Sequence, residues 1–345
     1  MTRTDRLRTL LKDNEGVIIS GYANIFYFAG FTSEDALLFI THKHQILITD
    51  SRYSVQARLQ AKDFEIHDIT EGAAKIAEKL DAEVLGFEEE HVTVKQLAMF
   101  QKFGKKLKPM QKLLNGMRAV KDADEIRRIR NAEALGDAAM SHLLEKLDVG
   151  MTELDAALIL EFYMRKNGAT KTSFDTIVAS GVRSSMPHGT ATDKIIEKGD
   201  FVTFDFGCVL DGYCSDMTRT VVMGNCSDRQ KEIYEVVLKA QLAGISAAAP
   251  GVKCSDIDKA ARTVIEDAGY GECFGHSLGH SLGIEIHEQP VFSPNCQELT
   301  EIGNVITVEP GIYIDGFGGV RIEDVIVIGE NTENLTKSCK ELTII

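Results

Sequence analysis

Acidic residues embedded in strand-like runs are the feature that most constrains the fold of this chain. Asp205 lies within VTFDFG, where alternate residues share one face, and Asp216 comes just before TRTVVMG. A turn at Asp211 and Gly212 would make these runs the legs of one hairpin, so that the two carboxylates approach the same point. Two aspartates beside a turn are often simply solvated, so this pair alone does not establish a binding site.

A second acidic pair repeats this arrangement. Glu309 lies in the apolar run VITVEPGIYI and Glu323 in GVRIEDVIVI, which we expect to be two strands joined by the glycine-rich turn IDGFGG. Burying an unpaired carboxylate is costly, so an acid in so apolar a strand needs a cation or a strong hydrogen-bond donor. Four converging carboxylates suit two divalent cations, about 3.5–4 Å apart in such sites, that supply hydroxide and polarise a carbonyl. We therefore predict a dinuclear metallohydrolase.

The segment GHSLGHSLGIEIHE at residues 275–288 adds three histidines, His276, His280 and His287. The spacing of the first two is that of the helical His-Glu-x-x-His zinc motif, but no glutamate follows His276 and glycines recur through the segment. We expect one of the three histidines to bind metal and the other two to lie beside the metals or the substrate. His188, in SSMPHGT, is a further candidate, although a lone loop histidine usually has no functional role.

Strand-like and helix-like segments alternate over residues 1–118, which predicts an α/β domain. The segments include strand-like runs at 16–21, 36–40, 45–50 and 83–90 and a helix-like run at 51–61. We expect the lysine-rich stretch from Lys102 to Lys112 to be a connection, because Pro109 interrupts it.

Residues 119–345 predict a second domain, of the α+β class, with a largely antiparallel sheet and helices packed on it. A capping-box-like sequence at Asp122 begins a long amphipathic helix, and Thr152 caps a second one. Further helices are expected at about 228–247 and 254–268, between strands rich in β-branched residues.

The charge balance and hydropathy pattern limit the partners of the chain. Its net charge of -14 disfavours nucleic acid and favours cations, including metal ions and peptide amino termini. No apolar run approaches the roughly 20 residues that span a bilayer, and the start, MTRTDRLRTLLKDNEG, lacks the apolar core of a secretory signal. We expect a cytoplasmic protein that binds no membrane. Its cysteines, odd in number and without a CxxC pair, are expected to be reduced and mostly buried.

Five segments of the second domain, taken in order, resemble the motif series of the pita-bread metallopeptidases. They are IVASG…PHG, DFGCVLDGYCSDMTRT, GHSLGHSLGIEIHE, VEPGIYI and GVRIED. The resemblance is to the Xaa-Pro group, the aminopeptidase P and prolidase family, and NIFYFAGF at 24–31 and TDSRY at 49–53 resemble its creatinase-type amino-terminal domain. It implies a creatinase-like α/β domain followed by a pita-bread α+β catalytic domain with a curved, largely antiparallel sheet.

This resemblance also implies a role for each metal-site candidate. Asp205 would bind one cation, His280 and Glu309 would bind the other, and Asp216 and Glu323 would bridge the two. The cations would be two divalent ions, usually manganese, with cobalt, zinc or iron also seen in the family, in line with the preference of oxygen ligands for such ions. A hydroxide that bridges them would be the nucleophile.

The remaining candidates are implied to act on the substrate. His188, His276 and His287 match positions that contact the substrate and stabilise the tetrahedral intermediate, and Arg321 matches an arginine that supports the metal ligands. Glu309 would also carry a proton to the leaving prolyl nitrogen. The implied substrates are short peptides with proline at the second position, and the implied assembly is a homodimer.

Dipeptides and longer peptides stay open as alternative substrates. Val291 follows the HEQP segment at the point where some prolidases carry an arginine that is thought to bind the dipeptide carboxylate. Two other classes share the fold, creatinase-like amidinohydrolases and non-catalytic peptide-binding relatives, but both typically lack ligands that are all present here. Methionine aminopeptidases share the ligand set but normally lack a first domain of this length.

Overall fold

The computed structural model describes all 345 residues, and the chain divides into two compact units, residues 1–118 and 119–345. No helix in it is both long enough and apolar enough to cross a membrane. Every cysteine is a free thiol, but only Cys208, Cys214 and Cys254 are buried, so burial is less general than expected.

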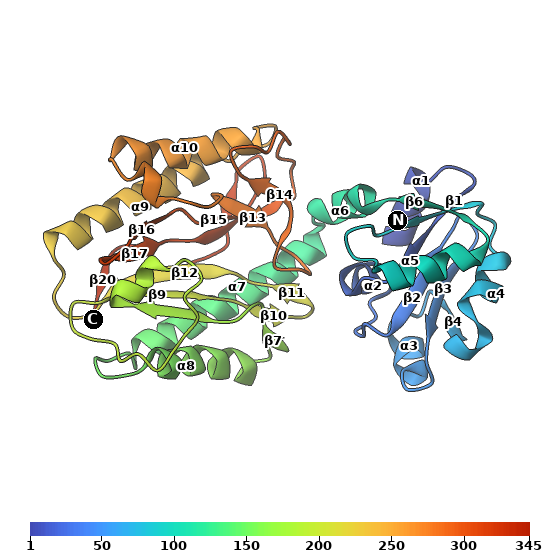
Figure 1. The fold of residues 1–345 in the computed structure, drawn as a ribbon, viewed down its shortest axis with the longest axis horizontal. Helices are drawn as coiled ribbons and strands as arrows, with labels where there is room; N and C mark the ends of the chain where they lie inside the picture. The colour runs from blue at the N-terminus through green and yellow to red at the C-terminus, as the bar shows by residue number, and fades with distance from the viewer. The chain divides into compact units, whose positions relative to one another are not determined.

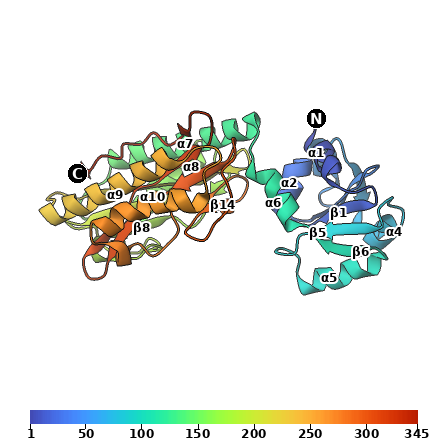
Figure 2. The ribbon, with the colours of Figure 1, turned by 90° about the horizontal axis from the view of Figure 1, so that it is seen from above.

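The first unit is built around a six-stranded mixed sheet with the strand order β4-β3-β2-β1-β5-β6 (Figure 1). Its strands are β1 (Glu15–Ile19), β2 (Ala36–Ile40), β3 (Gln45–Thr49), β4 (Glu65–Asp68), β5 (Val84–Phe87) and β6 (Lys106–Pro109). Its helices are α1 (Arg3–Leu10), α2 (Tyr22–Ala29), α3 (Ser54–Gln60), α4 (Ala73–Glu78), α5 (Val94–Phe100) and α6 (Gln111–Ala119), which crosses the unit boundary. Figure 2 shows α1 and α2 on one side of β1 and β5, with α5 on the other side. The predicted α/β class of this domain is confirmed.

The expectation that residues 102–112 only connect elements is wrong. Residues 106–109 form the edge strand β6, which pairs in parallel with β5. Leu107 packs against the core while Lys106 and Lys108 are exposed, and the ammonium of Lys108 lies 2.8 Å from a carboxylate oxygen of Glu15. Lysines are typical of an edge strand, because one edge pairs with no neighbour, and Pro109 is tolerated at its end.

Four long helices and several short antiparallel sheets form the second unit. The helices are α7 (Ala123–Leu144), α8 (Glu153–Lys166), α9 (Asp228–Ala247) and α10 (Cys254–Asp267). The expected helix starts are confirmed, since Asp122 and Thr152 each form a complete capping box. α7 and α8 cover the sheet that contains β9 (Phe201–Phe206) and β12 (Met217–Val222), whereas α9 and α10 cover the sheet that contains β15 (Val305–Val308) (Figure 1).

The remaining strands complete two main sheets and two small ones. They are β7 (Lys171–Thr172), β8 (Ile177–Ser180), β10 (Cys208–Leu210), β11 (Tyr213–Cys214), β13 (Gly279–Ser281), β14 (Glu288–Phe292), β16 (Gly311–Ile314), β17 (Gly318–Arg321), β18 (Asp324–Val327), β19 (Glu333–Asn334) and β20 (Thr343–Ile344). The main sheets have the orders β20-β12-β9-β8 and β14-β13-β15-β18-β19, and the pairing is antiparallel except between β12 and β20. The predicted α+β class with a largely antiparallel sheet is confirmed.

Candidate metal centre

The first acidic pair lies on the hairpin that the sequence predicts. β9 and β12 pair with Asp205 opposite Thr218, and beyond them the chain forms the smaller pair β10 and β11. Asp211 and Gly212 close the turn with φ of 50° and 81°, the left-handed backbone that a two-residue hairpin turn requires. Asp216 lies at the break between β11 and β12, so the hairpin changes sheet at this carboxylate.

The second acidic pair also lies where strands change sheet. The sequence predicts two long strands here, but the structure breaks each of them. β15 pairs with β18, which places Val308 opposite Asp324, while β16 pairs only with β17. Pro310 has no N–H to donate to a ladder, so the first strand breaks beside it. Glu309 directly follows β15 and Glu323 directly precedes β18, so both acids occupy the breaks, as Asp216 does.

His280 is brought to the acids by a close approach of two strands. It lies in β13, between β14 and β15, and its backbone N–H donates to the hydroxyl of Thr307 over 3.0 Å. A Cβ at Gly279 would lie 1.9 Å from the carbonyl oxygen of Thr307, so only glycine lets β13 lie this close. The N–H of Glu309 donates to the carbonyl of Leu278 over 2.8 Å, which fixes the acid beside the histidine strand.

A cavity of about 480 Å³ in the second unit collects every residue that the sequence singles out for the site. These residues are Asp205, Asp216, His188, His276, His280, His287, Glu309, Arg321 and Glu323. They come from five separate stretches of the chain, so the fold rather than the sequence spacing makes them neighbours.

The acids and His280 approach one another within metal-ligand range. One ligand atom from each of Asp216, His280 and Glu323 lies within 4.8 Å of the other two. The Nε2 atom of His280 is 3.5 Å from an oxygen of Asp216 and 3.5 Å from an oxygen of Glu309. Asp205 is joined to the group through Arg321, whose guanidinium lies 2.5 Å from Oδ2 of Asp205.

The electrostatics of this cluster call for cations. Burial, followed by the charge of neighbouring acids, raises the pKa of Asp216 and that of Glu323 well above their ordinary values, and burial raises the pKa of Glu309 to about 8. Buried oxygens Oδ1 of Asp205 and Oε1 of Glu323 accept no hydrogen bond. Because such groups are costly unless paired, oxygen-rich divalent sites fit this donor set. Burial also lowers the pKa of His280 to about 4, which keeps the imidazole neutral, the form that binds metals.

Arg321 and Thr218 hold two of the carboxylates in place. The guanidinium of Arg321 donates to Asp205, to the hydroxyl of Tyr313 over 2.6 Å and to the hydroxyl of Thr218 over 3.1 Å. That Thr218 hydroxyl donates in turn to Oε2 of Glu323 over 2.6 Å. One buried arginine therefore orients an acid from each of the two hairpins.

The other histidines lie around the acids in the cavity wall. The Nε2 atom of His276 is 3.0 Å from the hydroxyl of Tyr313, and Nδ1 is 2.8 Å from the carbonyl oxygen of Ser277. Burial lowers the pKa of His276 to about 4, so its ring is neutral. The ring of His287 packs edge-on against that of His280, with 4.4 Å between centroids, and His188 lines the cavity from an exposed loop position.

Three polar residues of this region are not predicted from the sequence. Tyr313 and Thr218 bridge Arg321 to its neighbours, and an exposed carboxylate, Asp175, lines the same cavity. Tyr313 and Thr218 lie in the motifs VEPGIYI and DMTRT, so the sequence does indicate their place in strands. Which partners they meet depends on strand register between hairpins that are about a hundred residues apart.

Comparisons with known proteins agree with this geometry. Residues 127–330 match the model of metallopeptidase family M24, and residues 3–120 match the creatinase/prolidase N-terminal domain. Among solved structures, the Xaa-Pro dipeptidase from Bacillus anthracis is 42% identical with a TM-score of 0.96 and 99% of each chain covered. The X-Pro aminopeptidase from Thermotoga maritima MSB8 is 38% identical with a TM-score of 0.92, covering 99% of this chain and 100% of that one.

A further relative is similar to this chain over nearly its whole length. The Xaa-Pro dipeptidase of Pyrococcus horikoshii is 38% identical over 340 residues, which are 95% of this chain and 94% of that protein. The second unit carries a cavity lined by acids and histidines on paired hairpins, and an α/β domain precedes this unit in the chain. Together these features define a metallopeptidase of the two-domain pita-bread class. The chain belongs to metallopeptidase family M24, and the predicted family resemblance is confirmed.

Proposed function

We propose that this protein is a dinuclear-metal peptidase that hydrolyses the bond between an N-terminal residue and a following proline. The observation that carries the proposal is the convergence of four carboxylates and a neutral imidazole in one cavity, with buried carboxylate oxygens that accept no hydrogen bond. The names of the relatives, Xaa-Pro dipeptidase and X-Pro aminopeptidase, supply the substrate class.

The five ligands would divide between two divalent ions, with manganese our first choice and cobalt, zinc or iron as alternatives. Asp205 would hold one ion, His280 and Glu309 the other, and Asp216 and Glu323 both. When bound, such a pair supplies hydroxide at neutral pH and polarises the scissile carbonyl. That chemistry suits a bond to proline, which is a tertiary amide without an N–H.

The chain's own residues then bind and orient the substrate. His276 is held by Tyr313, which also accepts from Arg321, so the neutral imidazole is fixed at the cavity wall. We assign His276, His188 and His287 to contact with the substrate and with the oxygen that becomes negative during attack. Glu309, whose Oε1 accepts from the hydroxyl of Thr307 over 3.1 Å, would move a proton to the leaving prolyl nitrogen.

Peptides longer than two residues fit the cavity at least as well as dipeptides. Arg321 is the one lysine or arginine in the cavity wall, and each of its three nitrogens already donates one hydrogen bond, to Asp205, Thr218 or Tyr313. A dipeptide presents a free carboxylate next to the scissile bond, whereas a tripeptide presents a neutral carbonyl there. The wall therefore holds no guanidinium or ammonium for a dipeptide other than that of Arg321, which already binds residues of the site itself.

An activity assay tests the proposal. Protein stripped with a chelator and reloaded with Mn²⁺ is expected to cleave Xaa-Pro-Xaa tripeptides, with Xaa-Pro dipeptides as the second substrate and peptides with alanine in place of proline as the control. Absence of cleavage of both proline substrates would refute the proposed function. A strong preference for dipeptides would refute only the argument from Arg321.

A further inference from the structure

Arg219 lies directly behind the proposed metal centre, and all of its donors are used. It is a residue of β12, its side chain is 3% exposed, and it does not line the cavity. NH1 donates to the carbonyl of Thr218 over 2.8 Å and to that of Glu323 over 2.5 Å. NH2 donates to Asp324 over 2.7 Å and to the carbonyl of Ser338 over 2.8 Å, and Nε donates to a fourth carbonyl, that of Cys339, over 3.0 Å. The five N–H groups of a guanidinium therefore meet five acceptors.

The main chain of Glu323 is the part of the metal centre that these bonds hold. Its N–H donates to the carbonyl of Thr218 over 3.1 Å, and its carbonyl accepts from Arg219. The hydroxyl of Thr218 also donates to the Glu323 carboxylate. Because a guanidinium is planar and rigid, the two carbonyl oxygens that share NH1 have fixed relative positions. The carboxylate of Glu323 therefore leaves a backbone that is held on both sides.

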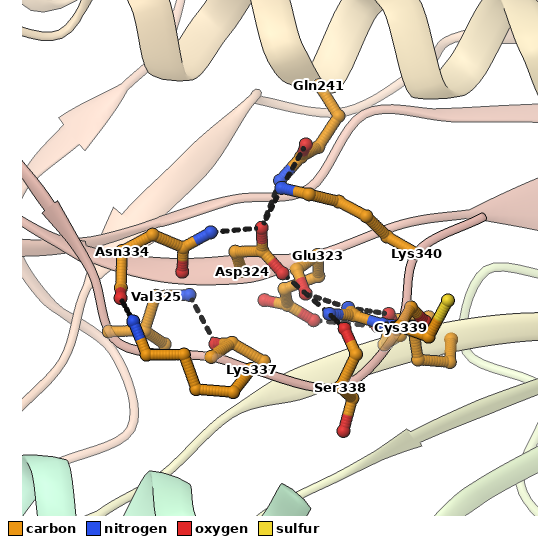
Figure 3. A network of polar contacts seen from close by, with 12 residues as sticks. Gln241, Glu323, Asp324, Val325, Asn334, Lys337, Ser338, Cys339 and Lys340 are labelled. Atoms are coloured by element: carbon orange, nitrogen blue, oxygen red, sulfur yellow. Dashed lines mark hydrogen bonds and ion pairs between the residues drawn. The ribbon is translucent and has the colours of Figure 1, made fainter.

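Asp324 anchors the opposite side of the same arginine. Its side chain is fully buried, and Oδ1 accepts from Arg219. Oδ2 accepts from Gln241 over 2.8 Å, from Asn334 over 2.6 Å and from the ammonium of Lys340 over 2.5 Å. Figure 3 shows these three side chains converging on Asp324, next to Glu323. Glu323 and the first residue of β18 thus point to opposite sides, Glu323 toward the cavity and Asp324 into this cluster.

The carboxy-terminal segment supplies much of the cluster. Ser338 and Cys339 offer their carbonyls to Arg219, and Lys340 reaches Asp324 (Figure 3). Beyond them β20 pairs with β12, with Thr343 opposite Val221. The segment is therefore tied to the strand that follows Asp216 as well as to the strand that follows Glu323.

We propose that Arg219, Asp324 and residues 338–340 are positioning elements of the metal centre, which fix the direction in which Glu323 projects. The inference rests on the proposed function, because it takes Glu323 as a metal ligand. A buried ion pair adds little net stability, since desolvation offsets its attraction, so its geometric effect is the more direct consequence. Groups that orient metal ligands in this way typically change metal affinity or activity about 10–100-fold when they are altered.

The test compares metal affinity with stability in matched variants. Arg219→Lys keeps the charge but loses the planar fork, Asp324→Asn keeps the shape but loses the charge, and Lys340→Met removes one donor from the edge of the cluster. Ile265→Ala, in the fully buried core of α10, is the control, because it destabilises the same unit without touching the cluster. Mn²⁺ affinity of the chelator-stripped proteins is measured by titration calorimetry, alongside the thermal midpoint of each metal-free protein.

We expect Arg219→Lys and Asp324→Asn to weaken Mn²⁺ binding about 10–100-fold. Ile265→Ala should weaken Mn²⁺ binding less than these variants do, relative to its loss of thermal midpoint. At saturating Mn²⁺ they should show a lower kcat with an unchanged KM, because neither side chain lines the cavity. Parent-like Mn²⁺ affinity with a lowered midpoint would overturn the inference and leave the cluster a purely structural role. Should a variant at Arg219 or Asp324 fail to fold, Lys340→Met decides, since parent-like affinity there would overturn the inference equally. A parent protein that binds no Mn²⁺ would instead refute the proposed function, and the inference with it.

Discussion

Arg321 donates to Oδ2 of Asp205 over 2.5 Å, while Oδ1 of the same carboxylate is buried without a donor. One oxygen is thus held by the protein and the other is left for a ligand. This asymmetry suits a carboxylate that binds a metal ion through one oxygen while a hydrogen bond to the other oxygen fixes its orientation. It also makes Arg321 the residue on which the orientation of Asp205 depends.

Arg321→Lys should therefore lower activity and metal affinity about 10–100-fold, because an ammonium cannot reach Asp205, Tyr313 and Thr218 together. Mn²⁺ titration and kcat with a tripeptide substrate measure the effect. Tyr313→Phe, which removes one acceptor and leaves the arginine in place, should have a smaller effect. Equal losses in the two variants would mean that the tyrosine, rather than the arginine, orients the site.

Changing a proposed bridging ligand should affect both metal ions. Asp216→Asn and Glu323→Gln are expected to abolish turnover and to lower the bound metal at both sites, as measured by elemental analysis of dialysed protein. Asp175→Asn is the matched control, because this carboxylate lines the same cavity but is exposed and outside the cluster. Loss of only one ion in the Glu323 variant would contradict its assignment as a bridge.

His276→Ala should separate catalysis from metal binding. Its ring is held by Tyr313 and Ser277 rather than by the acids, so we expect full metal content with turnover reduced about 10²–10⁴-fold. Elemental analysis and kcat on the same preparation check both parts. Metal loss in this variant would show that His276, and not His280, is the ligand histidine.

The metal-free protein should lose stability as the pH rises. Burial raises the pKa of Glu309 from 4.5 to about 8 in the folded chain, so between these values the folded state binds a proton that the unfolded state has released. Burial lowers the pKa of His276 and His280, which opposes this effect below about pH 6.5, so the free energy of unfolding must decrease with increasing pH above that value. Urea unfolding in the presence of a chelator, at several pH values from about 6.5 to about 8, measures the slope.

Glu309→Gln is the control for this pH effect. It should flatten part of the slope, while Glu133, whose pKa burial raises to about 8, still contributes to it. A slope of opposite sign, or one that Glu309→Gln leaves unchanged, would contradict the assignment of a buried, protonated carboxyl to this position.

Much of the site could be predicted because its acids lie in unusual places. A carboxylate in a run such as VITVEPGIYI conflicts with ordinary strand composition, and that conflict singles out Glu309 from the sequence alone. The same pattern predicts unbroken strands where the protein has β15 and β16, and β17 and β18, because local sequence does not show that strands change partners at Glu309 and Glu323. The prediction for residues 102–112 fails for a related reason, since an edge strand rich in lysine resembles a linker until its neighbour is known.

The cluster behind the metal centre could not be predicted, because it depends on contacts between residues that are far apart in the sequence. The side chains of Arg219, Asp324 and Lys340 come together from positions up to 121 residues apart, 219 to 340. Arg219 and Asp324 lie in the motifs DMTRT and GVRIED, but neither motif shows that the two side chains meet. Their burial, and the saturation of the guanidinium, follow from the packing of β12, β18 and the carboxy-terminal segment.

Titration of the chelator-stripped protein with Mn²⁺, followed in parallel by calorimetry and by hydrolysis of an Xaa-Pro-Xaa tripeptide, tests most directly whether this cavity holds a catalytic metal pair. We expect two Mn²⁺ ions per chain, with hydrolysis appearing only as they bind, and loss of both binding and hydrolysis in Glu323→Gln. Undiminished hydrolysis in excess chelator, or Mn²⁺ binding that Glu323→Gln leaves unchanged, would contradict the assignment.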